Sequence, residues 1–167
     1  PLLQSLCEHK IVQSTHGVLC NARPDHLDVM GPSEKDVALA LAGTVPYEGE
    51  FHTTERKHLP IFSMATSDRK SELIAISEKA SDTISDQEIA AFSYNEFKDN
   101  VALALSICQT LGVDRQIALQ GMWAATPDPG ALTAYTLTHR GVSITFANGF
   151  AANDPESTSS SVSVLGY

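Results

Sequence analysis

Apolar and polar residues follow two different periods along this chain, and the change between them separates strands from helices. Short apolar runs predict buried strands, at residues 17–20, 50–54 and 73–76. Apolar residues at helical spacing predict helices between them, at residues 1–9, 33–42 and 58–65. Gly43 and Pro46 end the second of these helices, and residues 67–70 form a polar turn. Strands that alternate with helices predict an α/β fold with a mostly parallel sheet.

Capping residues and turns divide the rest of the chain. A serine followed three residues later by an acid marks two helix starts, Ser33 with Asp36 and Ser85 with Glu88. The strongest helical stripe covers residues 100–111 and stops at Gly112, and Asp114 caps the next helix. Pro-Asp-Pro-Gly at 127–130 predicts an extended turn and a domain boundary. Beyond it, two alternating runs predict a hairpin, at residues 132–138 and 142–147.

Composition narrows the class of protein. With 167 residues and 43% hydrophobic content, the chain is long enough for one ordinary globular domain. Its net charge of −9 argues against nonspecific binding to nucleic acid. No apolar run reaches the roughly 18 residues of a membrane span, and no signal peptide is present. Cys7, Cys20 and Cys108 are widely spaced, so we expect reduced, mostly buried thiols in a cytoplasmic protein.

The most informative segment is the polar loop after the first predicted strand. It contains Asn21, and then Asp25 and Asp28 on either side of His26. Ligands of α/β sheets bind at the carboxyl ends of strands, where this loop lies. Carboxylates and a neutral imidazole suit a divalent cation such as Mg²⁺. The alternative is a solvated loop in which Asp25 or Asp28 caps the following helix.

The same loop carries a family resemblance. Asn-x-x-x-Asp-His-x-Asp at 21–28 resembles the central-domain motif of the Mur ligase superfamily. Its continuation to Pro32 resembles one branch in particular, the ATP-dependent subunit of poly-γ-glutamate synthase from bacterial capsule formation. Three later segments match that branch in order and spacing, at residues 97–105, 121–131 and 146–155. Four ordered matches are far more specific than any one motif.

The resemblance implies a division into two parts. Residues 1–127 correspond to the C-terminal part of the central ATPase domain, and 128–167 to a linker, a hairpin and the start of a third α/β domain. No Gly-x-x-x-x-Gly-Lys-Ser/Thr phosphate loop occurs in the sequence, although the family has one before its Asp-His-x-Asp motif. We therefore expect an internal fragment that lacks an amino-terminal phosphate-loop segment and is inactive alone.

The resemblance also implies roles for the loop and for the segment at 97–105. His26 would help to hold Mg²⁺ between ATP and the substrate carboxylate, with Asp25 and Asp28 supporting it. Asn21 would belong to the cofactor-binding residues. Asn100 would contact adenine and Phe97 would pack near the base. The alternative is that Asn100, or Asp99 before it, simply caps its helix.

The segment at 146–155 resembles the opening of the third domain in its capsule-branch form. It implies contacts to the ATP ribose or the incoming glutamate, from Asn148, Asn153 and Asp154. The alternative is that Asn-Gly and Asp-Pro make ordinary turns. Thr133 stands where the branch usually has an arginine, which puts one anion contact in doubt. We interpret the remaining histidines as surface groups, namely His9, His16, His52, His58 and His139.

The predicted function is part of an ATP-dependent amide ligase that extends poly-γ-glutamate through an acyl phosphate. The implied partners are glutamate, the polymer and membrane-embedded synthase subunits, which would hold the protein at the inner face of the cell membrane. The alternatives are another Mur-type ligase (folate, cyanophycin or cell-wall) and a noncatalytic fragment with partial nucleotide binding. Exposed edges of a truncated sheet predict self-association.

Overall fold

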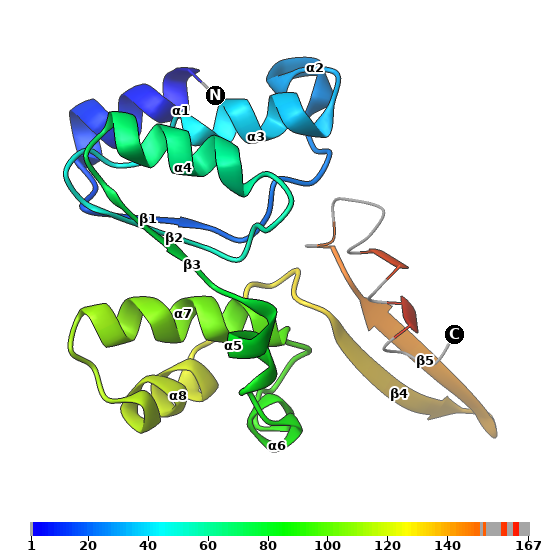
Figure 1. Cartoon of the computed structure of the whole chain (residues 1–167). Helices are drawn as coiled ribbons and strands as arrows, with labels where there is room; N and C mark the ends of the chain where they lie inside the picture. The colour runs from blue at the N-terminus through cyan, green and yellow to red at the C-terminus, as the bar shows by residue number, and fades with distance from the viewer. Residues whose placement is uncertain (1, 151, 153–157, 160–161, 164–167) are drawn as a thin grey trace.

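The computed structural model describes residues 2–150, 152, 158–159 and 162–163, and its centre is a three-stranded parallel sheet (Figure 1). The strands are β1 (His16–Leu19), β2 (Glu50–Thr53) and β3 (Glu72–Ala75), in the order β1-β2-β3. The register aligns His16 with Glu50 and Glu50 with Glu72. All three carboxyl ends therefore meet at one edge of the sheet, and the predicted parallel α/β arrangement is confirmed.

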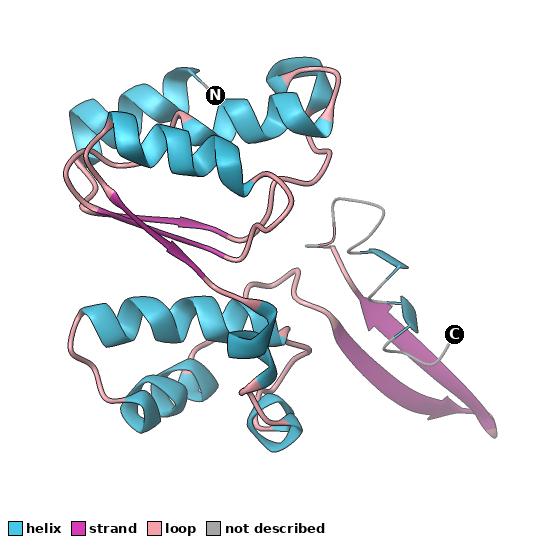
Figure 2. Cartoon of the chain, in the orientation of Figure 1, coloured by secondary structure: helices cyan, strands magenta, loops and turns pink. Residues whose placement is uncertain are grey.

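Helices cover both faces of this sheet (Figure 2). On one face lie α3 (Glu34–Ala42) and α4 (Leu59–Asp68), which pack against each other, and α4 also packs against β3. On the other face lies α7 (Lys98–Thr110), which contacts β2 and carries α8 (Arg115–Ala124) on its outer side. The short helices α1 (Leu2–Leu6), α2 (Leu27–Met30), α5 (Glu78–Asp82) and α6 (Asp86–Ala90) lie at the periphery, and α1 continues into the π-helix η1 (Cys7–Val12).

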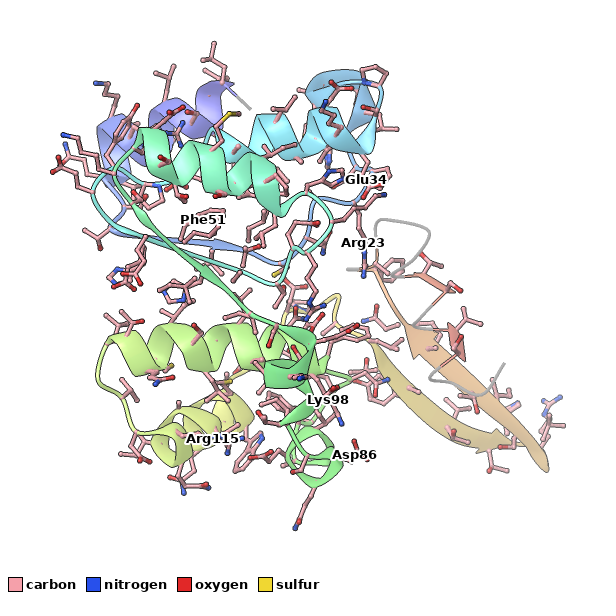
Figure 3. The ribbon with its side chains drawn as sticks, in the orientation of Figure 1. Arg23, Glu34, Phe51, Asp86, Lys98 and Arg115 are labelled. Carbon is pink, nitrogen blue, oxygen red and sulfur yellow. The ribbon has the colours of Figure 1, made fainter. Side chains whose placement is uncertain are left out.

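Each face has its own hydrophobic core. The first core contains Phe51 and Phe62, whose rings stack with centroids 5.5 Å apart, and Phe51 lies between the sheet and α4 in Figure 3. Gly17 is required beside it, because a Cβ there would come within 2.8 Å of both Phe51 and Pro46. The second core joins β3 to α5, α7 and α8, through Ile76, Ile84, Phe92, Val101, Ala102, Leu103 and Leu119.

The predicted capping residues are confirmed. Ser33 with Asp36 and Ser85 with Glu88 form complete capping boxes, in which each partner bonds the other's backbone. Asp114 accepts hydrogen bonds from the backbone N–H groups of Gln116 and Ile117 at the start of α8. Because these bonds satisfy N–H groups that lack partners within the helix, the sequence could locate these helix starts closely.

Other details of the sequence prediction are wrong. The first helical segment continues to Val12, and α4 extends through Asp68 into the expected turn. Helix α7 begins at Lys98 with Phe97 at the N-cap, so neither Asp99 nor Asn100 caps it. Likewise His26 occupies the N-cap of α2 without a side-chain bond, so neither Asp25 nor Asp28 takes that position.

Two groups of side chains also differ in burial from the prediction. Cys7 and Cys20 are exposed rather than buried, since both lie at the ends of elements and not within the cores. His52 is fully buried, because β2 is the central strand and α7 covers this side chain. Its Nδ1 lies 2.9 Å from Ser106 Oγ and its Nε2 lies 3.1 Å from Glu50 Oε2.

The predicted hairpin is present and projects away from the sheet (Figure 1). It consists of β4 (Thr133–His139) and β5 (Val142–Asn148), joined at Arg140 and Gly141, which both have positive φ. Such a two-residue turn matches the twist of the strands. One face of the hairpin is apolar and 46–60% exposed, and its members are Tyr135, Leu137, Ile144 and Phe146.

Candidate functional site

A cleft of about 820 Å³ opens at the carboxyl ends of the three parallel strands. It is built from the loops that follow β1, β2 and β3 and from the first turn of α7. Figure 3 shows Arg23, Glu34 and Lys98 on this side of the molecule. This is the position in which open α/β sheets bind their ligands, because loops from successive strands converge there.

The cleft gathers positive charge in a protein that is acidic overall. Four of the eleven Lys and Arg residues line it, against five of the twenty acids. The basic residues are Arg23, Arg56, Lys57 and Lys98. This enrichment fits an anionic ligand, since the field of a few close charges dominates over the distant net charge.

Ion pairs fix several of these basic side chains. The Arg56 guanidinium binds both carboxylate oxygens of Asp99, at 2.7 and 3.0 Å, and also donates to Ser81 Oγ. These hydrogen bonds from Arg56 lower the pKa of the Asp99 carboxyl. Lys57 binds Glu34 and lowers the pKa of that carboxyl, and His58 Nε2 lies 3.1 Å from the other oxygen of Glu34. The loop after β2 is thus bound to α3, α5 and α7 around the cleft.

A second pocket, of about 390 Å³, adjoins the cleft and shares Phe97 and Asn100 with it. Its lining is mostly apolar and comes from three separated segments of the chain, at residues 94–100, 128–132 and 149–152. The Asn100 side-chain amide donates to Glu96 Oε1 at 2.8 Å, which fixes its orientation. Phe97 remains 46% exposed. An exposed ring beside an oriented amide is suited to a flat heterocycle with polar edges.

The structure also locates Asn148 at the edge of this pocket. Its side-chain amide donates to the backbone oxygen of Pro129 at 2.8 Å, and its oxygen accepts from Phe150 N–H. The adjacent Gly149 lines the pocket itself. Asn148 therefore connects the end of β5 to the turn at 127–130, and the role predicted for it as a cofactor contact stays a prediction. Asn153 and Asp154 lie outside the described residues.

The loop with the candidate metal ligand begins in the cleft and then leaves it. Asn21 lines the cleft, and its Oδ1 accepts a hydrogen bond from Arg23 N–H. His26 has a φ of +46° and a side chain that is 62% exposed, with Nδ1 2.8 Å from Asp25 Oδ1. Asp28 lies in the exposed first turn of α2. A carboxylate beside one ring nitrogen leaves the other nitrogen available, as in many metal-binding histidines.

Two searches of the described residues give negative results. Within the part of the chain that the structure describes, no three His, Cys, Asp or Glu side chains lie close enough together to hold a metal ion. No helix among the same residues has the length and hydrophobicity needed to cross a membrane. A metal bound at His26 would therefore need ligands beyond this described set.

The sequence analysis missed the residues at the end of β2. Thr53, Thr54, Glu55 and Arg56 fasten the neighbouring loops of the cleft, yet no motif singled them out. A signal was available, because a run of polar and charged residues directly after a buried strand falls at the binding edge of a parallel sheet. The same argument had been applied only to the loop after β1.

Comparison with known proteins agrees with the fold and the motifs. The fold is that of a Mur-ligase-type enzyme: a mutant of L. casei folylpolyglutamate synthase superimposes with a TM-score of 0.53 and 14% identity, over 72% of this chain and 38% of that one. No protein-family profile matches the chain. Its sequence is 38% identical to the capsule biosynthesis protein CapB of Bacillus anthracis and 36% identical to PGA synthase CapB of Bacillus subtilis strain 168.

Both matches cover 158 residues, which are 95% of this chain but only 33% and 39% of the two relatives. The chain is thus a homologue of one segment of CapB, and it spans little more than a third of the length of these relatives. The resemblance inferred from the four motifs is confirmed.

Proposed function

We propose that this chain is part of an ATP-dependent amide ligase that polymerises glutamate into poly-γ-glutamate. The observation that carries the proposal is the pair of adjoining hollows, one basic and one apolar, that share Phe97 and Asn100. Three of the four segments that resemble the synthase branch converge on the apolar pocket. The fourth segment supplies Asn21 and Arg23 to the basic cleft.

The two hollows divide the nucleotide between them. The base would occupy the apolar pocket, with Phe97 against its face and the oriented Asn100 amide at its edge. The phosphates would extend into the cleft, toward Arg23, Arg56 and Lys98. The residues present therefore fit a nucleoside triphosphate by both shape and charge.

The acyl-phosphate route requires two anions to approach each other. The γ-phosphate and the glutamyl carboxylate repel, and a bound Mg²⁺ would offset that repulsion and polarise the phosphoryl group. His26 is the side chain that we assign to this ion, oriented by Asp25. Asp28 would contribute a negative charge nearby without direct contact. Asn148, Asn153 and Asp154 would contact the ribose or the incoming glutamate, whose amine attacks the acyl phosphate and releases phosphate.

The setting of the enzyme follows from the same relationship. We infer that the complete protein works with membrane-embedded synthase subunits on the cytoplasmic face of the membrane, with glutamate as substrate and the growing polymer as product. An amino-terminal phosphate-loop segment would complete the phosphate site, so the 167-residue chain alone is expected to bind nucleotide without turnover.

Calorimetric titration of the chain with ATP and Mg²⁺ tests the proposal. We expect saturable binding that weakens about 10- to 100-fold in His26→Ala, as for loss of a metal-site contact. Loss of one neutral hydrogen bond in Asn100→Ala should cost about fivefold. His139→Ala, an exposed histidine at the hairpin tip, is the matched control and should bind as the wild type does.

The outcome has two clear readings. If the wild-type chain binds no nucleotide, the assignment of the two hollows is wrong and the noncatalytic alternative is favoured. If binding is present but equally strong in His26→Ala and His139→Ala, the metal role of His26 is wrong while the nucleotide pocket stands.

A further inference from the structure

The end of β2 fastens the loop that follows β1 by a series of consecutive side chains. Thr53 Oγ1 donates to the backbone oxygen of Leu19 at 2.8 Å, and Thr54 Oγ1 donates to that of Cys20 at 2.6 Å. The backbone N–H of Thr54 also donates to Leu19. These bonds continue the pairing of the two strands beyond the last regular position of the sheet.

Glu55 is the last member of this series and is the only acid among the buried residues. Only 7% of Glu55 is exposed. Its Oε2 accepts a hydrogen bond from Ala22 N–H, and its Oε1 accepts one from His58 N–H, each at 2.9 Å. A single carboxylate thus joins the loop after β1 to the turn that begins α4.

The geometry demands a carboxylate in particular. Each of its oxygens meets a backbone N–H, so the side chain must offer two acceptors and no donor. Glutamine has the same shape, but its NH₂ group would face one of these N–H donors. Burying an ionised group carries a desolvation penalty that an apolar residue would avoid. The presence of Glu55 at the cleft is therefore better explained by the placement of the two loops than by packing.

The fastened loop is the one that carries the candidate site residues. Ala22, which Glu55 holds, is fully buried in the first core, and Asn21 and Arg23 on either side of it line the cleft. We propose that Glu55 is a positioning residue, which sets the path of residues 21–26 and thereby the place of His26 relative to the cleft. The functional half of this inference rests on the proposed role of His26.

Glu55→Gln in the full 167-residue chain tests both halves. The structural readout is amide hydrogen exchange, in which the Ala22 and His58 N–H groups should exchange at least tenfold faster than in the wild type. The functional readout is affinity for ATP and Mg²⁺, which should weaken about tenfold, as for loss of a supporting contact. Glu72→Gln, the same change at an exposed position of β3, is the matched control and should alter neither readout.

A double variant separates positioning from general destabilisation. If Glu55 acts through His26, its substitution should weaken binding little further in a His26→Ala background, because the two changes remove the same interaction. Additive effects would overturn the positioning role. Unchanged exchange of the Ala22 amide in Glu55→Gln would overturn the structural half, whatever the binding result.

Two provisions keep the experiment decisive. Should Glu55→Gln fail to fold, Thr54→Val removes only the bond to Cys20 and should show smaller changes of the same kind in both readouts; no change would then count against the proposal. Should the wild type not bind ATP, the proposed function fails, and the exchange readout still decides whether Glu55 holds the loop.

Discussion

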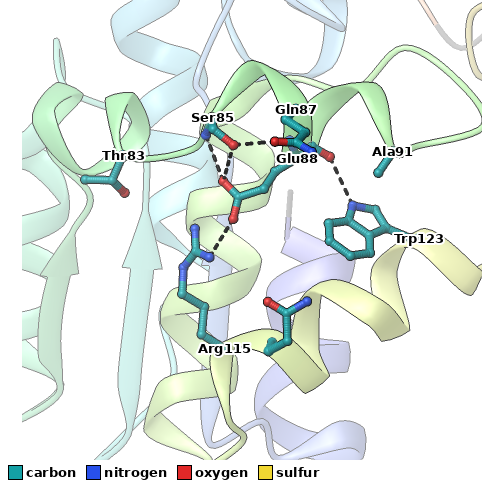
Figure 4. Close-up of a pocket in the computed structure, with 8 residues that line it drawn as sticks. Thr83, Ser85, Gln87, Glu88, Ala91, Arg115 and Trp123 are labelled. Atoms are coloured by element: carbon teal, nitrogen blue, oxygen red, sulfur yellow. Dashed lines mark hydrogen bonds and ion pairs between the residues drawn. The ribbon is translucent and has the colours of Figure 1, made fainter.

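Replacing Glu88 with glutamine removes a charge from the contact between α6 and α8 while keeping the shape of the side chain. In the structure this carboxylate binds Arg115 with one oxygen and the backbone and hydroxyl of Ser85 with the other (Figure 4). Glutamine still serves in a capping box, so the substitution mainly tests the ion pair. Trp123, the only tryptophan, donates its indole N–H to the backbone oxygen of Glu88 and reports on the same contact.

The magnitude follows from the proton affinity of the carboxyl. The hydrogen bond from Arg115, helped by the backbone N–H of Ser85, lowers the pKa of Glu88 from 4.5 to about 2. At about 1.36 kcal/mol per pH unit, this corresponds to at most about 3.4 kcal/mol. Arg115 is 48% exposed, so solvent screens the pair. We therefore expect Glu88→Gln to lower the free energy of unfolding by about 1–2 kcal/mol at pH 7.

The pH dependence has a defined sign. Because the pKa of Glu88 is lower in the folded chain than in the unfolded chain, its contribution is complete above about pH 4.5 and is lost as the pH falls toward 2. Urea unfolding followed by Trp123 fluorescence, between pH 7 and pH 2.5, measures this. Asp86→Asn is the matched control, since the Asp86 side chain is 95% exposed and should contribute little. A wild-type advantage over Glu88→Gln that is absent at pH 7, or that persists unchanged at pH 2.5, would refute the reasoning.

Three further predictions concern other parts of the fold. Asp114→Ala removes the cap of α8 and should cost about 1 kcal/mol in urea unfolding, whereas an unchanged midpoint would contradict the capping role. Phe62→Ala leaves a cavity beside the Phe51 ring and should cost about 3–5 kcal/mol by thermal unfolding, and a loss below 1 kcal/mol would show that this core is loosely packed. The exposed apolar face of the hairpin predicts self-association in sedimentation velocity, reduced by Ile144→Lys, and a monodisperse wild-type monomer would rule this out.

The sequence was most informative where local physics decides the structure. Ser33, Ser85 and Asp114 cap helices through contacts within three residues, so their roles were visible without a fold. The hairpin was predictable for a similar reason, since alternation and a Gly-containing turn define its register. The parallel sheet followed from the order of strands and helices, although each strand boundary was displaced or shortened by about one residue.

The candidate site was only partly predictable, because its geometry depends on contacts between distant segments. Phe97 and Asn100 were identified by resemblance, and the structure brings them together with the turn at 128–132. Glu55 gave no such signal, since its two partners are backbone groups that lie 33 and 3 residues away. The burial of His52 was equally hidden, because it depends on α7 crossing β2, a contact between residues 54 positions apart.

The order β1-β2-β3 has a consequence for how the chain is made. Strand order in space equals strand order in the chain, so each strand joins the free edge left by the one before it. No strand has to be inserted between two neighbours that are already paired. A polypeptide that leaves the ribosome from its amino terminus could therefore extend the sheet one strand at a time during synthesis, because every new strand finds its neighbour already in place.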